Sequence, residues 1–314
     1  MIKILGKLLL YLLLFTMLLG EKKLFYNPDS VILYDITSLG IRKIKQKKLC
    51  IGDNVNLEEI IKKRKIVFIG NYREVVIKYA EYDENKKVYN VYYEVGFVTP
   101  QSQFSLTKIV IMGVYDENFN YLAIEEYPLY RYAGEEKLLE EITTMYENGE
   151  VLFFKFYNDK DVKSQKYVIN GKEIYLIRNL KNGDLFFNDE SIKKIFRPGL
   201  MNEKKTFLLG TSAIIDTVKN NKLYRYDFKT GKLEMLKEFS NIGVILQTLI
   251  ENDNKLIYWE LDSKYSKEER KLFIFDLKSK KTKELKLSDE VFEEFYYSHE
   301  IRNVNKKLIE QFSE

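Results

Sequence analysis

His299 is the only histidine in the chain, and it lies in the sequence Tyr297-Ser-His-Glu300. A hydrolase built on serine, histidine and an acid would have to use it as the base. No Gly-x-Ser-x-Gly nucleophile motif accompanies it, because the nearest match, Gly210-Thr-Ser-Ala, lacks the second glycine. A single histidine also excludes zinc sites with several histidine ligands. We therefore interpret His299 as a surface or core residue, and the catalytic residues stay unassigned.

Carboxylates are plentiful, and two of them could serve as the acid and base of a glycosidase. Glu125-Glu126 and Glu293-Glu294 are adjacent pairs. Adjacent side chains on a strand point to opposite faces, so adjacency alone brings neither pair together. A secreted carbohydrate-active enzyme with paired carboxylates therefore stays open as the alternative to a binding protein.

Acidic stretches supply the oxygen atoms that calcium prefers. They are Tyr82–Asn85, Tyr115–Asn118, Asp159–Asp161 and Glu251–Asn254. Asp159-Lys-Asp161 has the Asp-x-Asp spacing but lacks the glycine and the final glutamate of an EF-hand loop. Asp and Asn also start turns, because their side chains accept hydrogen bonds from backbone amides two residues on. We interpret all four stretches as turns and predict no metal site and no cofactor.

Aromatic and basic clusters are the remaining candidates for a binding site. Tyr127–Tyr132 and Trp259 could stack on sugar rings, although packing in the core of a sheet explains them more simply. The basic runs Lys62–Lys65 and Lys278–Lys283 could contact an anionic partner, although solvated surface is again the simpler interpretation. The binding residues stay unassigned.

The composition excludes several classes of protein. The chain has 314 residues, of which 45% are hydrophobic and 31% are charged, so it is neither disordered nor wholly embedded in a membrane. Its 51 basic and 47 acidic side chains leave a net charge of only +4, which argues against nucleic acid as a partner. Cys50 is the only cysteine, so an intramolecular disulfide is impossible, and we interpret Cys50 as a small apolar filler.

The N-terminus predicts export across a membrane. Lys3 and Lys7 precede the apolar run Leu8–Leu19, and Gly20 and Glu21 follow. This order of a basic start, a short apolar run and a small residue is typical of a secretory signal. Leu18 makes cleavage after Gly20 unfavourable, so residues 1–20 are either a signal peptide or an anchor. Glu21 stands where a lipoprotein signal needs cysteine, so lipidation is not expected.

The rest of the chain carries a repeat. Lys222–Glu234 and Lys271–Lys283 align without a gap, each with a strand that ends in aromatic-Asp, a short polar turn and a returning strand. Gly231 can take the positive φ that a tight hairpin needs. Weaker copies upstream place turns at Asp35, Asp83, Ala133 and Asn179, and together with Asp227 and Asp276 these positions are spaced by 46 to 50 residues. Asp116 also starts a convincing hairpin, but it lies off this period.

This pattern resembles that of β-propeller proteins, whose blades are four-stranded antiparallel sheets repeated every 40 to 50 residues or so. The chain has no signature of a particular subfamily. The resemblance implies a mainly all-β fold of about six blades in one domain over residues 21–314. The alternative is another antiparallel β-rich or α+β fold. Short helices are expected at Asn56–Arg64, Glu135–Tyr146, Ser288–Phe295 and Ile301–Glu314.

These features predict an exported, non-enzymatic binding or scaffold protein of a bacterial envelope. We expect it to be periplasmic, on the cell surface or extracellular, and an uncleaved anchor would tie it to the membrane. The expected partner is a protein or an envelope component. Membrane contact is expected only through residues 1–20.

Overall fold

A computed structural model describes the parts of the chain that form the sheets. The described residues are 20–49, 59, 74–98, 106–131, 162–169, 172–179, 185–187, 192, 195–212, 221–239, 243–261, 270–301 and 304–313. Residues 1–19, Cys50, Lys62–Lys65, Asp159–Asp161 and the predicted helix at Glu135–Tyr146 lie outside them, as does most of Asn56–Arg64. In the part of the chain that is described, no helix has the length and apolar character needed to cross a bilayer.

Strands dominate the described residues. They are β1 (Glu21–Tyr26), β2 (Ser30–Ile36), β3 (Ile41–Lys48), β4 (Glu74–Asp83), β5 (Val88–Val98), β6 (Leu106–Tyr115), β7 (Tyr121–Arg131), β8 (Val162–Ile169), β9 (Lys172–Asn179), β10 (Leu185–Phe187), β11 (Phe196–Met201), β12 (Phe207–Ser212), β13 (Lys222–Asp227), β14 (Leu233–Glu238), β15 (Gly243–Ile250), β16 (Lys255–Leu261), β17 (Arg270–Asp276), β18 (Thr282–Leu285) and β19 (His299–Glu300). The helices α6 (Asp289–Tyr296) and α7 (Lys306–Ser313) confirm the two predicted near the C-terminus.

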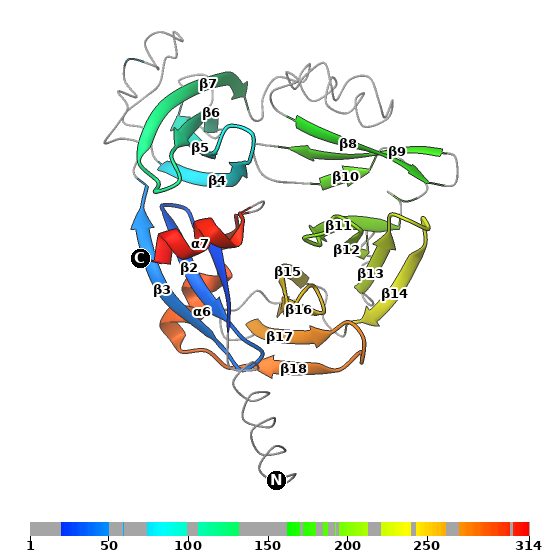
Figure 1. Ribbon diagram of the computed structural model, residues 1–314. Coiled ribbons are helices and arrows are strands. Elements are labelled where there is room, and N and C mark those ends of the chain that lie inside the picture. Colours follow the sequence, from blue (N-terminus) through cyan, green and yellow to red (C-terminus); the bar gives the residue numbers. More distant parts are fainter. Residues whose placement is uncertain are drawn as a thin grey trace.

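The strands form antiparallel sheets arranged in a ring (Figure 1). We name them blade 1 (β19-β1-β2-β3), blade 2 (β4 to β7), blade 3 (β10-β9-β8), blade 4 (β11 to β14) and blade 5 (β15 to β18). This ring confirms the predicted β-propeller. The described residues contain four four-stranded blades and one three-stranded sheet, where the sequence spacing predicted about six blades.

Central and outer strands differ because only central strands are covered on both faces. β16 is buried from Leu256 to Leu261, and its apolar side chains are divided between the clusters shared with blade 1 and α6 and with blade 4. β3 forms the outer edge of blade 1, and lysines occupy half of its positions. Lysine on an edge strand keeps it solvated and discourages pairing with another chain.

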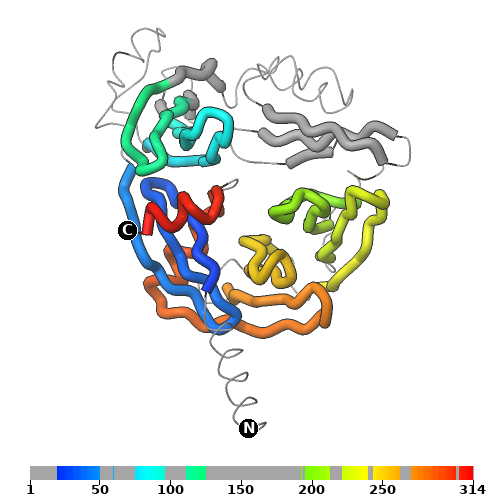
Figure 2. The backbone as a smooth tube through the Cα atoms, viewed as in Figure 1, coloured from blue at the N-terminus to red at the C-terminus, as the bar shows by residue number. Residues whose placement is uncertain are grey.

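The two ends of the described chain meet in blade 1, as the adjacent blue and red segments in Figure 2 show. Phe25 pairs with Glu300 and Tyr26 with His299, so β19 supplies the innermost strand of a blade that β1 continues. The Ile301 amide extends the pairing with a 2.8 Å hydrogen bond to the Leu24 carbonyl. A strand from the far end of the sequence thus closes the ring.

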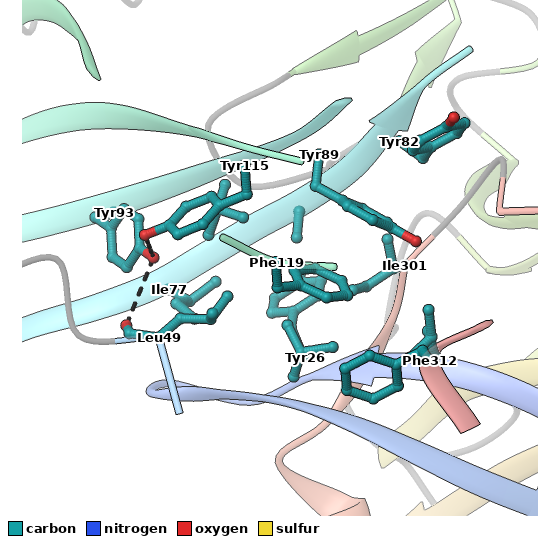
Figure 3. Packing of buried hydrophobic residues seen from close by; sticks show 14 of the residues in the cluster. Tyr26, Leu49, Ile77, Tyr82, Tyr89, Tyr93, Tyr115, Phe119, Ile301 and Phe312 are labelled. Carbon is teal, nitrogen blue, oxygen red and sulfur yellow. Dashed lines mark hydrogen bonds between the residues drawn. The ribbon is translucent and has the colours of Figure 1, made fainter. Parts of the chain in front are cut away.

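Apolar clusters fill the junctions between blades. Figure 3 shows the cluster where blades 1 and 2 meet α7. There the Phe312 ring packs edge-on against Phe119, with ring centroids 5.4 Å apart. Tyr93 and Tyr115 join their hydroxyls by a 2.6 Å hydrogen bond in the same cluster. A second cluster packs α6 between blades 5 and 1 and includes the fully buried Trp259.

Aspartate turns close hairpins largely as predicted. Asp227 Oδ1 accepts the Lys229 and Thr230 amides at 3.1 and 2.9 Å. Asp276 Oδ1 accepts the Lys278 and Ser279 amides at 3.0 and 2.7 Å. Gly231 has φ 67°, which confirms the predicted positive φ.

The regular period in the first half of the chain is wrong. Asp227 and Asp276 end the third strands of their blades, and the equivalent residue of blade 2 is Asp116, which lies off the period. Asp83 ends the first strand of that blade rather than the third. Asp35 starts no turn, because Thr37 Oγ1 accepts the turn amides of blade 1. Ala133 lies outside the described residues.

The connections between strands sort onto two faces of the ring. Antiparallel strands alternate in direction, so the turns after the first and third strands of a blade lie at one end. The hydrogen bond from the Leu277 amide to the Asn254 carbonyl, 2.9 Å long, joins two such turns in blade 5. We call this side the turn face, and its connections have four or five residues, namely 37–40, 84–87, 116–120, 202–206, 228–232, 251–254 and 277–281. The opposite side, the loop face, receives the strand ends joined by residues 49–73, 99–105, 132–161, 213–221 and 262–269.

Candidate binding surface

Four side chains gather on the loop face where blades 5 and 1 meet. They are Arg270, Tyr296, Tyr297 and His299, and we call them the Arg270 patch. Arg270 begins β17 at the end next to residues 262–269. The other three lie between the end of α6 and the start of β19. β19 is the innermost strand of blade 1 and β17 is the third strand of blade 5, so His299 lies nearer the centre of the ring than Arg270.

The local sequence explains how α6 forms and positions the residues that follow it. Ser288 precedes the helix, and Asp289 and Glu290 place negative charge in its first turn, where the helix dipole favours it. Phe295 is buried near the end of the helix, and Gln247 of β15 donates to its carbonyl at 3.2 Å. Gln247 also donates to the Ser298 carbonyl. These bonds fix the chain as it leaves α6.

The Arg270 guanidinium stacks on aromatic rings and is largely shielded from solvent. The Arg270 side chain is only 8% exposed, and its guanidinium carbon lies 4.2 Å from the centre of the Tyr296 ring. The Tyr297 ring centre is 5.9 Å away, and a Glu293 carboxylate oxygen is 3.7 Å from Nη2. Nη1 is buried without a hydrogen-bond acceptor. A guanidinium with an unused donor is an electrostatic attraction for a carboxylate or another anionic group.

The segment after α6 alternates between exposed and buried residues. Tyr297 is 50% exposed, Ser298 is fully buried, and His299 is exposed. The His299 ring lies 5.5 Å from that of Tyr26. The Ser298 hydroxyl donates to the Glu294 carbonyl at 2.7 Å, which turns it toward α6. The arrangement presents an aromatic ring and an imidazole to solvent beside a fixed cation.

The candidate acid pair Glu293-Glu294 is divided between different partners. Glu293 lies near Arg270, whereas Glu294 accepts a 3.1 Å hydrogen bond from the Tyr34 hydroxyl and a 3.2 Å bond from Lys43. Burial raises the pKa of Tyr34, so its hydroxyl stays a donor. Glu125 and Glu126 lie on β7, where only the backbone is described.

The aromatic candidates are not brought to one surface. Trp259 is fully buried, and its ring packs edge-on against Phe292 and Tyr296 of α6. This confirms that Trp259 is a core residue. Tyr127–Tyr130 lies on β7, again with only the backbone described.

The acidic stretches that are described form turns. Asp83 and Asp116 each accept two backbone amides through Oδ1, and Glu251–Asn254 joins β15 to β16. Within the described ranges, no group of three or more histidine, cysteine, aspartate or glutamate side chains is placed to hold a metal ion. The basic run Lys278–Lys283 forms the exposed β17–β18 turn and the start of β18, on the turn face.

A polar network on the inner side of blade 1 links the ring closure to blade 5. The Lys23 ammonium lies 2.7 Å from Glu300 and 3.7 Å from Glu21. The Thr248 hydroxyl of β15 donates to the other Glu300 oxygen at 2.8 Å. Burial acts to lower the pKa of Lys23, but attraction to Glu300 and Glu21 outweighs it and raises the pKa. These two carboxylates converge on a lysine that offsets part of their charge, and the contacts of Glu300 join blades 1 and 5.

Sequence reasoning considered His299 but missed Arg270. No motif marks Arg270, because its contacts come from a helix that follows much later in the chain. The only available signal was the position of an arginine at the start of an aromatic strand, and this is too common to single it out.

Comparisons with known proteins place the chain in no family. No known protein family matches the sequence, and no curated protein is detectably similar to it. Similar solved structures include the Dos1 propeller, with 10% identity over 86% of this chain and 74% of that chain and a TM-score of 0.34. A chain of the nidogen–laminin complex has 9% identity over 89% and 96%, with a TM-score of 0.32. Oligogalacturonate lyase in complex with manganese has 6% identity over 82% of this chain and only 62% of its own, with a TM-score of 0.30.

Proposed function

We propose that this chain is an exported, non-enzymatic propeller that binds a protein or another component of a bacterial envelope through its loop face. The observation that carries the proposal is the Arg270 patch, where Tyr297 is 50% exposed beside a guanidinium that stacking holds in place. Aromatic and arginine side chains are the residues that most often dominate binding energy at interfaces.

The chemistry of the patch favours a partner that carries carboxylates. The Arg270 guanidinium stays charged at any physiological pH, and the Glu293 carboxylate is 3.7 Å away and 39% exposed. A carboxylate of the partner can compete with Glu293 for Nη2 of Arg270, while apolar groups of the partner cover the Tyr297 ring.

Export rests on the N-terminal sequence, where two lysines precede the apolar run Leu8–Leu19. The direct test is the accessibility of the full chain to an external protease in bacterial cells whose outer layers have been removed and whose inner membrane stays sealed. Digestion of the β-rich domain without lysis supports export. Protection until the cells are lysed overturns it. Mass spectrometry of the recovered N-terminus decides between a cleaved signal and an anchor.

Binding can be tested with isolated cell envelopes and three variants of the purified chain. Tyr297→Ser and Arg270→Met should each weaken retention about tenfold or more, which corresponds to about 1.4 kcal/mol. Met235→Ser is the matched control, since Met235 is 52% exposed on β14, the outer strand of blade 4. Equal retention of all three variants would overturn the proposed site. Turnover of an envelope polysaccharide by the purified chain would favour the carbohydrate-active alternative.

A further inference from the structure

The turn face is the side of the propeller from which the N-terminal segment departs. β1 begins at Glu21, and only Gly20 separates it from the end of the apolar run at Leu19. The Glu21 carboxylate accepts a 2.9 Å hydrogen bond from the Glu251 amide, in the turn between β15 and β16. A Cβ placed on Gly20 would lie 1.6 Å from Asp35 Oδ1 and 3.1 Å from the Thr37 methyl group. These contacts leave no spacer between the apolar run and the turn face.

Exposed lysines are distributed around that same face. They come from separate elements, and six that represent them are Lys22, Lys86, Lys204, Lys229, Lys278 and Lys307. Lys22 lies at the start of β1 and Lys307 on α7, which packs beside blades 1 and 2 (Figure 1). The other four lie in turns of blades 2, 4 and 5, so the positive charges are spread over several blades instead of forming one cluster.

The carboxylates of these turns are placed differently from the lysines. Asp83, Asp227 and Asp276 each fold back on their own turn and accept its backbone amides. Their charges stay close to the ring, whereas flexible lysine stems can extend the ammonium groups outward. Glu84, Glu203 and Glu251 are exposed acids on the same face, so the surface is mixed, and the attraction depends on the reach of the lysine side chains.

From this geometry we propose that residues 1–19 stay attached as an anchor and that the turn face rests on an anionic lipid surface, with the loop face turned outward. This proposal rests on the proposed export and adds the orientation of the propeller. Leu8–Leu19 is shorter than the roughly 20 apolar residues of a typical spanning helix, so a second membrane signal is physically useful. Each lysine held near an anionic bilayer contributes about 1 kcal/mol. The expectation of membrane contact through residues 1–20 alone would then be too narrow.

The test reconstitutes the full chain in lipid vesicles and measures the distance of each face from the headgroups. Cys50→Ser provides a background in which Lys278→Cys labels the turn face and His299→Cys labels the loop face. A fluorophore on each cysteine is quenched by a nitroxide carried on the lipid headgroup. In vesicles containing phosphatidylglycerol, we expect at least about threefold stronger quenching at position 278 than at position 299.

Charge supplies the controls. Neutral phosphatidylcholine vesicles, or about 1 M salt, at which the Debye length is about 3 Å, should reduce the difference between the two positions. The variant Lys86→Gln/Lys204→Gln/Lys229→Gln should reduce it in anionic vesicles at low salt. Equal quenching at both positions, or a difference that neither salt nor lipid charge changes, overturns the proposal. Since reconstitution requires no cell, failure of export in the protease assay and failure of this orientation are separate results.

Discussion

Replacing Glu300 by alanine should destabilise the closure of the ring. The substitution removes the 2.7 Å partner of Lys23 and the 2.8 Å acceptor of the Thr248 hydroxyl. Breaking a buried ion pair from one side costs about 3–5 kcal/mol, because it leaves a buried charge without compensation. The Lys23 and Glu300 side chains retain 16% and 21% exposure, and Glu21 stays 3.7 Å from Lys23. We therefore expect a loss of about 2–3 kcal/mol in the free energy of unfolding.

Trp259 provides the assay for this loss. It is the only tryptophan, and it packs against α6, which immediately precedes the closing strand. Urea unfolding followed by its fluorescence should show a lower midpoint with an unchanged slope, which identifies a change in stability. Glu300→Gln should cost less than Glu300→Ala, because the amide oxygen still accepts a hydrogen bond. Lys23→Met combined with Glu300→Ala should cost less than the sum of the single changes.

A surface ion pair gives the matched control. Glu290 is 83% exposed and lies 3.7 Å from Lys43, so Glu290→Ala should cost less than about 0.5 kcal/mol. The contribution of Lys23 to stability should also depend on pH in a defined direction. The pKa of Lys23 is raised on folding, so its contribution is complete below the pKa of the unfolded lysine, near 10.4, and is lost as the pH rises through the folded value. If Glu300→Ala is no more harmful than Glu290→Ala, the network does not stabilise the closure.

Two further changes test the packing of the sheets and the aspartate turns. Gly210→Ala should cost at least about 2 kcal/mol or prevent folding, because its Cβ would lie 2.2 Å from the Arg197 carbonyl oxygen. Gly40→Ala is the control and should be tolerated, because no atom lies within 4 Å of the new Cβ. Equal urea midpoints for the two variants would contradict this expectation. Asp276→Asn should make the free energy of unfolding less dependent on pH in acid. The Ser279 amide holds the pKa of Asp276 below its usual value, so the carboxylate stabilises the fold above about pH 4 and loses this effect as the pH falls. If the urea midpoint of the variant changes between pH 5 and pH 3 as much as that of the wild type, the assignment is refuted.

The strands and their turns could be predicted because both are local. Alternating apolar and polar residues around an aspartate specify a hairpin, and Asp227 and Asp276 form the predicted turns. The position of a turn within its blade could not be predicted. Asp83 and Asp116 both accept two backbone amides, yet one follows the first strand of blade 2 and the other the third. The same aspartate turn occurs at both positions, so the number of blades cannot be derived from the spacing of such turns.

The Arg270 patch depended on contacts that no local pattern records. Arg270 stacks on Tyr296, which comes from a helix rather than from the neighbouring strand. The innermost strand of blade 1 was equally difficult to predict, because β19 has only two residues and is defined by its pairing with β1. Both features arise when distant segments meet, and pairings of this kind are set by the whole fold.

The pairing of β1 with β19 also governs when the ring can become complete. Lys23 and Glu300 are 277 residues apart in sequence, so β1 has no inner neighbour until nearly the entire chain has been synthesised. Closing a loop of that length carries an entropic cost of about 5 kcal/mol, and contacts of such long range slow folding. Until then, β1 presents an unpaired edge, a state that invites aggregation. Premature termination before β19 would therefore yield an open ring rather than a slightly shortened protein.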